Sequence, residues 1–412
     1  MVYFAIIASF VCVAATYMYV SLSEGSFVNV LTPALAFLVP ADYLLECYHL
    51  WLFGPSASQF AYVLIYACYA ATFMAFGLGY CNITLPALRL PFTGRPRGGN
   101  RVTPYLVLFV AIALYWPVIS KFKGDLANPR LIYEQTRTGY GVYFFLSATL
   151  CYTALILLLF KRRLGTLELI GFTLVSLVFL WLHGSKNQIL IVLFILATYW
   201  VYVRQKRVSL VKFAVFGTLL FAIGLGLFLI TNPQIILDSQ GLKGVAAYSD
   251  YTRNGMLVID SDMGPLYGRL SLEQELYSRI PRPLFPEKPK DFGALYLAEH
   301  FYPDSFVNGQ GAPAFSFGLA FADFGVLALP ILLIENLLAG MLLKVFMTGL
   351  RRYNDPGNFT LVLFASGLTL IPVSASFVLP EATALAIIVN LLHSFRSRPV
   401  RAEAQQLDSA SA

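Results

Sequence analysis

Long apolar blocks separated by short polar segments make up most of the chain. A helix of about 20 apolar residues crosses the roughly 30 Å hydrocarbon core of a bilayer. The pattern therefore predicts an all-α, polytopic transmembrane helix bundle of about 11 spans, in a range of 10–12. One block, residues 27–53, is irregular because two prolines, Asp42 and Glu46 interrupt it. The other blocks cover residues 2–21, 58–80, 104–120, 142–160, 166–183, 188–203, 209–230, 324–349, 358–374 and 380–395.

A large polar segment, residues 232–313, interrupts the apolar pattern late in the chain. It carries seven Lys or Arg and ten Asp or Glu. Loops longer than about 12–15 residues usually have a function or are disordered. The many Tyr, Phe, Leu and Ile of this segment could pack together, which favours one large external loop made of short helices and irregular structure.

Local signals divide this loop further. Ser271–Tyr277 predicts the first turn of a helix, with Ser271 as its N-cap. Phe292–Phe301 predicts a second helix. Four prolines between residues 281 and 289 exclude a regular helix there and favour extended backbone.

Basic residues fall into five clusters, and two predicted spans separate each cluster from the next. All five clusters therefore lie on one side of the membrane, and short loops rich in Lys and Arg face the cytoplasm. The opposite, external side then receives residues 121–141, the turn at residues 183–187 and the large loop. The clusters are Arg89–Arg101, Lys161–Arg163, Arg204–Arg207, Arg351–Arg352 and Arg396–Arg401.

These patterns divide the chain into four regions. Residues 1–231 hold the N-terminal transmembrane helices with short loops, and residues 232–313 form the large external loop. Residues 314–396 hold the C-terminal transmembrane helices, and residues 397–412 form a cytoplasmic tail that we expect to be disordered. The first 21 residues are apolar but lack a basic start, so we expect a retained helix there rather than a cleaved signal peptide.

Composition excludes several kinds of chemistry. Charged residues make up 12% of the chain, against about 25% in soluble domains. The five cysteines lie in or beside apolar blocks, which argues against a disulfide framework. The four histidines are scattered, and the sequence contains neither metal-ligand spacing nor a Gly-rich phosphate loop. The cytoplasmic loops are too short for a nucleotide-sugar transferase domain. We therefore expect no metal, no cofactor and no nucleic-acid partner.

The external segments carry Lys and Arg, which short external loops usually avoid. Arg binds phosphate through two parallel hydrogen bonds, and Lys supplies a compact point charge. We therefore interpret these residues as candidates to hold a diphosphate at the membrane surface. Ion pairs with the acids of the loop, contacts to lipid headgroups and, for Lys186, snorkelling to the interface remain open as alternatives. The candidates are Arg130, Lys186, Arg253, Arg269, Arg279, Arg282 and Lys288.

A glycosyl transfer or a hydrolysis would need a base that takes a proton from the attacking hydroxyl. Glu275 and His300 are candidates, the latter because histidine titrates near neutral pH. Glu275 lies four residues before Arg279, so a helical salt bridge explains it equally well. For His300, a solvated surface position is the favoured explanation. The other acids available are Asp260, Asp262, Glu273, Glu287, Glu299, Asp323 and Glu335.

Two motifs give the chain a resemblance to a known family. An Arg followed by ten residues and a Gly occurs in each external loop, as Arg130…Gly141 and Arg253…Gly264. The segment that starts at Arg279 reads Arg-Ile-Pro-Arg-Pro-Leu-Phe-Pro-Glu-Lys-Pro. Together with the many spans and the large late loop, these motifs resemble those of Wzy-type O-antigen polymerases, also called oligosaccharide repeat-unit polymerases.

The resemblance implies polymerisation of repeat units linked to undecaprenyl diphosphate, for O-antigen, capsule or exopolysaccharide. The reaction would take place on the periplasmic face of the bacterial inner membrane, with the large loop periplasmic and the C-terminus cytoplasmic. The glycosyl-diphosphate bond stores the energy, so this glycosyltransferase would need no metal and no nucleotide. Its partners would be the lipid-linked oligosaccharide, membrane lipid, a chain-length regulator and a flippase.

The resemblance also implies roles for the candidate residues. Arg279 and Arg282 would act in catalysis by stabilising the departing diphosphate. Glu275 or His300 would activate the acceptor hydroxyl. The diphosphate would be bound by Arg130, Lys186, Arg253, Arg269 and Lys288.

Two other functions stay open. An O-antigen ligase has a similar architecture and differs in its acceptor, which the sequence does not reveal. A flippase or another transporter of lipid-linked glycans would place charged residues or broken helices near the bilayer midplane and often contains inverted repeats. The charge concentrates in the external loop instead, which favours the polymerase.

Overall fold

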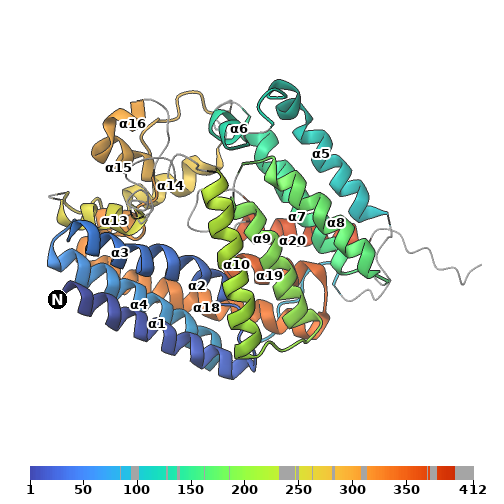
Figure 1. Cartoon of the computed structure of the whole chain (residues 1–412), viewed down its shortest axis with the longest axis horizontal. Coiled ribbons are helices and arrows are strands. Elements are labelled where there is room, and N and C mark those ends of the chain that lie inside the picture. The colour runs from blue at the N-terminus through green and yellow to red at the C-terminus, as the bar shows by residue number, and fades with distance from the viewer. Residues whose placement is uncertain are drawn as a thin grey trace, which may run out of the picture.

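The architecture is helical throughout the part of the chain that the structure describes. Figure 1 shows a computed structural model of the whole chain, with its helices labelled. Every regular element in the described residues is a helix, which confirms the predicted all-α class. The structure describes residues 1–83, 85–93, 102–126, 129–136, 140–161, 163–184, 186–231, 246, 250–261, 263–280, 284–307, 313–368, 370–371 and 378–394.

Three helices from distant parts of the chain lie side by side (Figure 1). They are α1 (Val2–Glu24), α4 (Gln59–Asn82) and α18 (Ala328–Tyr353). Helices α4 and α18 touch backbone to backbone at two glycines. A Cβ atom on Gly340 would lie 2.2 Å from the carbonyl oxygen of Phe76, and one on Gly79 would lie 2.3 Å from that of Leu337. Small residues allow membrane helices to approach this closely.

A second group of helices lies beside the first (Figure 1). It comprises α5 (Thr103–Lys121), α7 (Gly141–Leu159), α8 (Thr166–Trp181), α9 (Lys186–Thr198), the π-helical η2 (Tyr199–Val203), α10 (Leu210–Thr231), α19 (Pro356–Ala365) and α20 (Leu379–Ser394). Nearly every residue of α7 from Ser147 to Leu159 is buried, so this helix forms the centre of the group. Helix α19 ends before the predicted block at 358–374 does, because the chain turns at Gly367 with a φ of 84°.

The irregular apolar block at residues 27–53 is largely helical. It comprises α2 (Thr32–Leu38), the π-helical η1 (Val39–Leu44) and α3 (Leu45–Phe53). The π-helical turn confirms the predicted irregularity, and such turns occur frequently at functional sites. Polar contacts hold it against two neighbouring helices. The Tyr43 hydroxyl lies 2.7 Å from Ser9 Oγ of α1, and the Tyr66 hydroxyl of α4 donates to the Asp42 carbonyl at 2.5 Å.

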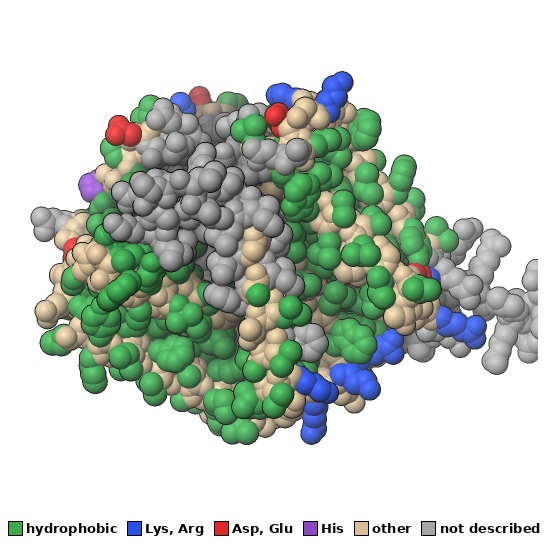
Figure 2. Space-filling view, in the orientation of Figure 1, with side chains coloured by type: hydrophobic (Ala, Val, Ile, Leu, Met, Phe, Trp, Pro, Cys, Tyr) green, Lys and Arg blue, Asp and Glu red, His purple; other side chains and the backbone are tan. Residues whose placement is uncertain are grey.

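Five helices among the described residues are long and apolar enough to cross a membrane. They are Val2–Glu24, Gln59–Asn82, Thr103–Lys121, Gly141–Leu159 and Gly318–Tyr353. Figure 2 shows hydrophobic side chains over a wide area of one face, with Lys and Arg gathered near its upper and lower edges. A large exposed apolar surface of this kind suits a bilayer. The chain is a multi-pass membrane protein, and the count of about 11 spans stays a prediction.

The polar segment at residues 232–313 contains short helices in its described part. They are α13 (Asp250–Asp260), α14 (Arg269–Arg279), α15 (Ala294–Phe301) and α16 (Pro303–Val307), and the chain then returns through α17 (Gly318–Phe324) and the 3-10 turn η3 (Gly325–Leu327). The helix predicted at Phe292–Phe301 is confirmed as α15, and the helical turn at Ser271–Tyr277 is confirmed as part of α14. The prediction of Ser271 as N-cap is wrong. Helix α14 begins after Gly268, whose φ of 85° favours glycine.

A carboxylate from α17 caps α14 in place of Ser271. The two oxygens of Asp323 accept hydrogen bonds from the backbone N–H groups of Leu270 at 2.9 Å and Ser271 at 2.7 Å. Asp323 is fully buried. A negative group at this position satisfies unpaired N–H groups and interacts favourably with the helix dipole. Asp323 therefore fixes the start of α14, which explains its presence in an apolar stretch.

Candidate active site

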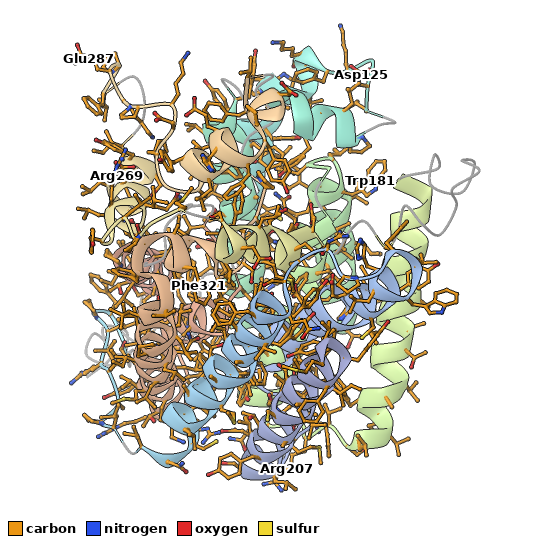
Figure 3. All side chains as sticks on the ribbon, turned by 90° about the vertical axis from the view of Figure 1, so that its left-hand side faces the viewer. Asp125, Trp181, Arg207, Arg269, Glu287 and Phe321 are labelled. Carbon is orange, nitrogen blue, oxygen red and sulfur yellow. The ribbon has the colours of Figure 1, made fainter. Side chains whose placement is uncertain are left out.

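The two predicted external loops lie at the same end of the molecule. Figure 3 shows Arg269 and Glu287 of the large loop at one end, together with Asp125 of the segment 121–141. Arg207, from one of the five basic clusters, lies at the opposite end. Most of the candidate cations therefore belong to segments that meet at one end of the helix bundle.

Arg279 lies in the last turn of α14, between two carboxylates. Its Nε donates to Oε1 of Glu381 at 2.5 Å, and Glu381 belongs to the first turn of α20. Its Nη1 donates to the carbonyl oxygen of Glu275 at 2.7 Å and also pairs with the Glu275 carboxylate. Hydrogen bonds to Glu381 and Glu275 hold the pKa of Arg279 above its ordinary value. The predicted Glu275–Arg279 salt bridge is confirmed.

Glu381 was not singled out in the sequence as a site residue. Its Oε2 is buried and has no hydrogen-bond partner among the described residues. The sequence signal was a lone carboxylate at the start of the apolar block 380–395, since ionisable residues within membrane segments are functional candidates by default. Among the described residues, the arrangement leaves one buried carboxylate oxygen of Glu381 available to a ligand, while the guanidinium of Arg279 holds the other.

Lys288 contacts the C-terminal end of α14. Its Nζ donates to the carbonyl oxygens of Tyr277 and Ile280, the latter at 3.1 Å, and lies 4.6 Å from the centroid of the Phe292 ring. A cation here satisfies carbonyls that the helix leaves unpaired. Lys288 therefore holds the end of α14 that carries Arg279.

Arg269 lies at the opposite end of the same helix. It pairs with Glu273 at 2.8 Å and lies 5.3 Å from the centroid of the Tyr296 ring. The Glu273 carboxylate raises the pKa of Arg269 above its ordinary value. Ten residues of α-helix separate Arg269 from Arg279, which corresponds to roughly 15 Å along the axis. The two arginines therefore do not form one cluster.

Arg253 of α13 faces the first turn of α3. Its Nε lies 4.0 Å from Oε2 of Glu46, a carboxylate that is fully buried. Oε1 of Glu46 accepts a hydrogen bond from the Tyr62 hydroxyl at 2.8 Å. The pair is thus a buried ion pair with further hydrogen bonding, and it ties the large loop to the bundle. Burial raises the pKa of the nearby Asp250 carboxyl, and Arg253 opposes this shift.

Asp42 reinforces the same connection. Its Oδ1 accepts hydrogen bonds from Thr252 of α13 at 2.5 Å and from the Tyr69 hydroxyl at 3.1 Å. Asp42 and Glu46 entered the sequence analysis only as irregularities of an apolar block. Their spacing of four residues in an apolar segment was the signal that both point to one side of a helix.

The structure does not bring His300 to Arg279. His300 is exposed at the end of α15, where its ring packs edge-on against Phe301 with centroids 4.8 Å apart. Helix α15 does contact α14, since Gln274 accepts a hydrogen bond from the backbone N–H of Ala294 at 3.1 Å. The described contacts therefore agree with a solvated surface position for His300.

For three of the predicted cations, the side chain is not among those that the structure describes. Arg282 lies outside the described residues, as do the side chains of Arg130 and Lys186. The backbone nevertheless brings the last two positions together, because a Cβ on Gly184 would lie 2.0 Å from the carbonyl oxygen of Pro129. Helix α6 (Pro129–Thr136) thus begins against the turn that precedes α9. Within the described residues, no three His, Cys, Asp or Glu side chains gather as a metal site.

Comparison with known proteins identifies two relatives of similar length. The chain is 36% identical over 380 residues to the O-antigen polymerase of Salmonella typhimurium and, to the same extent, to that of Salmonella typhi. Each alignment covers 90% of this chain and 90% of the relative. No protein-family model and no solved structure matches the chain.

Proposed function

Since the chain belongs to the O-antigen polymerase family and joins oligosaccharide repeat units in O-antigen synthesis, we propose that it uses a glycan on undecaprenyl diphosphate as donor and works on the periplasmic face of the inner membrane. A hydroxyl of the incoming lipid-linked unit attacks the anomeric carbon of the growing glycan. The glycosidic bond forms as the bond to the diphosphate breaks, and the hydroxyl proton passes to a base. No metal or nucleotide takes part.

The observation that carries this proposal is the position of Arg279 between Glu275 and Glu381. A guanidinium has five N–H donors, so it can hold two carboxylates and still contact a phosphate oxygen. Its fixed charge would stabilise the negative charge that develops on the departing diphosphate. Glu381, whose Oε2 is buried without a hydrogen-bond partner among the described residues, would accept the hydroxyl proton. Glu275 would orient Arg279 from within the same helix.

The other candidate residues are proposed to contact the lipid carrier, to hold α14 in place or to serve as an alternative base. Arg282 follows Arg279 closely in the sequence and is proposed as a second diphosphate contact. Arg253 would bind the carrier where α13 meets the bundle, while Lys288 holds the end of α14. The loop positions that could contact the carrier's second phosphate or lipid headgroups are Arg130, Lys186 and Arg269. His300 stays the alternative base, and its exposure makes it secondary to Glu381.

The proposed orientation places residues 232–313 and 121–141 in the periplasm and the C-terminus in the cytoplasm. It rests on the positive-inside rule and on the common position of both loops opposite Arg207 (Figure 3). A chain-length regulator and a flippase are proposed partners, since both act on the same lipid-linked substrate. Cysteine substitutions at Glu287 and Arg207 test the orientation, because a membrane-impermeant thiol reagent added outside should label only position 287.

Deletion of the gene tests the function itself. Cells without a polymerase still attach single repeat units to their surface lipid, and long chains should return when the wild-type gene is restored. Accumulation of long lipid-linked chains in the deletion strain would indicate a ligase instead. Loss of every surface repeat unit would indicate a flippase.

A further inference from the structure

A separate cavity lies between α6, α7 and α9. It has a volume of about 170 Å³, whereas one water needs only about 10–15 Å³ of such space. Tyr133 and Phe144 contribute aromatic rings to its wall, and Thr149, Tyr152 and Gln188 contribute polar groups. The cavity therefore has room for a ring-sized polar solute, and its lining mixes aromatic with hydrogen-bonding side chains.

Gln188 lines this cavity, and its amide oxygen is a buried acceptor. The side chain is 8% exposed, and its Oε1 is buried without a hydrogen-bond partner among the described residues. A buried acceptor without a partner destabilises the fold unless a ligand or an ordered water pairs with it. Nearby, the single hydroxyl proton of Thr149 has two acceptors within reach, the carbonyl oxygens of Leu370 at 2.8 Å and Phe145 at 3.0 Å. The lone pairs of Thr149 Oγ1 stay available as acceptors.

The cavity adjoins elements that carry two of the candidate cations. Helix α6 and the turn before α9 form one boundary, and these elements carry positions 130 and 186. On another side, Leu370 lines the cavity. A saccharide bound in the cavity would therefore lie beside the segments that hold two of the proposed carrier contacts.

We propose that this cavity binds one sugar ring of the lipid-linked saccharide. Aromatic rings pack against the apolar face of a sugar, and its hydroxyls donate to buried acceptors such as Gln188 Oε1. The ligand class is a neutral, hydroxyl-rich ring, because neither Lys nor Arg is part of the described lining. This assignment rests on the proposed function, and it adds a saccharide subsite to the site around Arg279.

Two variants test the subsite by different means. Gln188→Leu removes the acceptor and leaves the volume nearly unchanged, while Ala148→Leu fills the cavity without removing a polar group. Asn336→Leu is the matched control, since Asn336 is a half-buried membrane amide whose side chain, among the described residues, donates to Leu332 of its own helix, at 2.8 Å. The purified full-length protein is titrated with the free oligosaccharide of one repeat unit. The same proteins are titrated with sugar-free undecaprenyl diphosphate.

The subsite predicts that both cavity variants bind the oligosaccharide at least tenfold more weakly, whereas Asn336→Leu binds as the wild type does. Binding of undecaprenyl diphosphate should be the same in the wild type, the two cavity variants and the control variant. If one cavity variant fails to fold, the other decides. Equal oligosaccharide binding by wild type and cavity variants, or no binding by the wild type, would overturn the assignment. A loss confined to the sugar-free carrier would identify a lipid site instead and overturn it too. Long chains in the complemented deletion strain separate this outcome from a failure of the proposed function.

Discussion

Helices α4 and α18 meet through glycines and apolar side chains, whereas α14 is fixed at both ends by charged groups from other segments. At the first contact, Gly79 and Gly340 bring two backbones together. At the second, Asp323 caps the start of α14, while Glu381 and Lys288 hold its end. The membrane pair depends on shape, so almost any added volume should damage it. The loop helix α14 depends on charge, and some of its ionic contacts are made by the residues that are proposed to act in catalysis.

The largest effect on the amount of folded protein is expected from one added methyl group between α4 and α18. Gly340→Ala would place a Cβ 2.2 Å from the Phe76 carbonyl oxygen, so the two backbones must separate. Overpacking typically costs about 1–3 kcal/mol, which should lower the amount of protein in the membrane about fivefold. Gly171→Ala in α8 is the control, because no described atom outside the backbone of its own helix and its two chain neighbours lies within 4 Å of the added methyl group. Equal amounts of both variants on an immunoblot would show that the contact does not hold the pair.

Removal of the Arg279 guanidinium should abolish chain growth without removing the protein. Loss of one group that stabilises transition-state charge slows an enzyme by about 10²–10³, so Arg279→Ala should leave mostly single repeat units on a gel of surface polysaccharide. Arg351→Ala is the matched control. Arg351 pairs with Glu24 at the far end of α18 and should support long chains. Wild-type chain length in Arg279→Ala would refute the assignment of this site.

Asp323 and Glu381 separate a structural carboxylate from a chemical one. Asp323→Asn disturbs a buried helix cap worth about 1 kcal/mol, so the amount of membrane protein should fall severalfold and chain length with it. Glu381→Gln keeps the volume and a hydrogen bond but removes the base, so the amount should stay normal while chains collapse to single units. The comparison is made by measuring chain length per amount of protein. The distinction between the two carboxylates is refuted if Glu381→Gln keeps long chains, or if Asp323→Asn loses long chains at a normal amount of protein.

The smallest effect is expected at Lys288. Lys288→Met removes a cation from the last carbonyls of α14, a contribution of about 0.3–1 kcal/mol. The thermal unfolding temperature in detergent should fall slightly, with chains only moderately shortened. Lys288→Arg should behave as the wild type. Collapse to single repeat units in Lys288→Met would instead make Lys288 a diphosphate contact.

The sequence predicted what depends on neighbours in the chain. Apolar blocks gave the helices, the spacing of Glu275 and Arg279 gave their salt bridge, and Phe292–Phe301 gave α15. Contacts between segments that are distant in the chain could not be predicted from the sequence. The N-cap of α14 was assigned to Ser271 because a local hydroxyl was the only visible candidate, while the actual cap, Asp323, arrives from another helix.

The same limit applied to the candidate site. Its charge and the neighbouring prolines made Arg279 a candidate from the sequence. Its partner Glu381 follows a long apolar stretch, where its only local signal is that it is a lone carboxylate. In the sequence, Asp42 and Glu46 only interrupt an apolar block. In the structure, Thr252 contacts Asp42 and Arg253 contacts Glu46. Periodicity identifies elements, and only the fold shows which charged groups meet.

Exchange of the charges at the Arg279–Glu381 pair tests the central claim most directly. The double variant Arg279→Glu/Glu381→Arg keeps an ion pair between α14 and α20 but moves the cation away from the proposed diphosphate. We predict near-normal amounts of membrane protein and surface polysaccharide made of single repeat units. Recovery of long chains in the double variant would contradict the account, because the pair would then serve only to hold the two helices together.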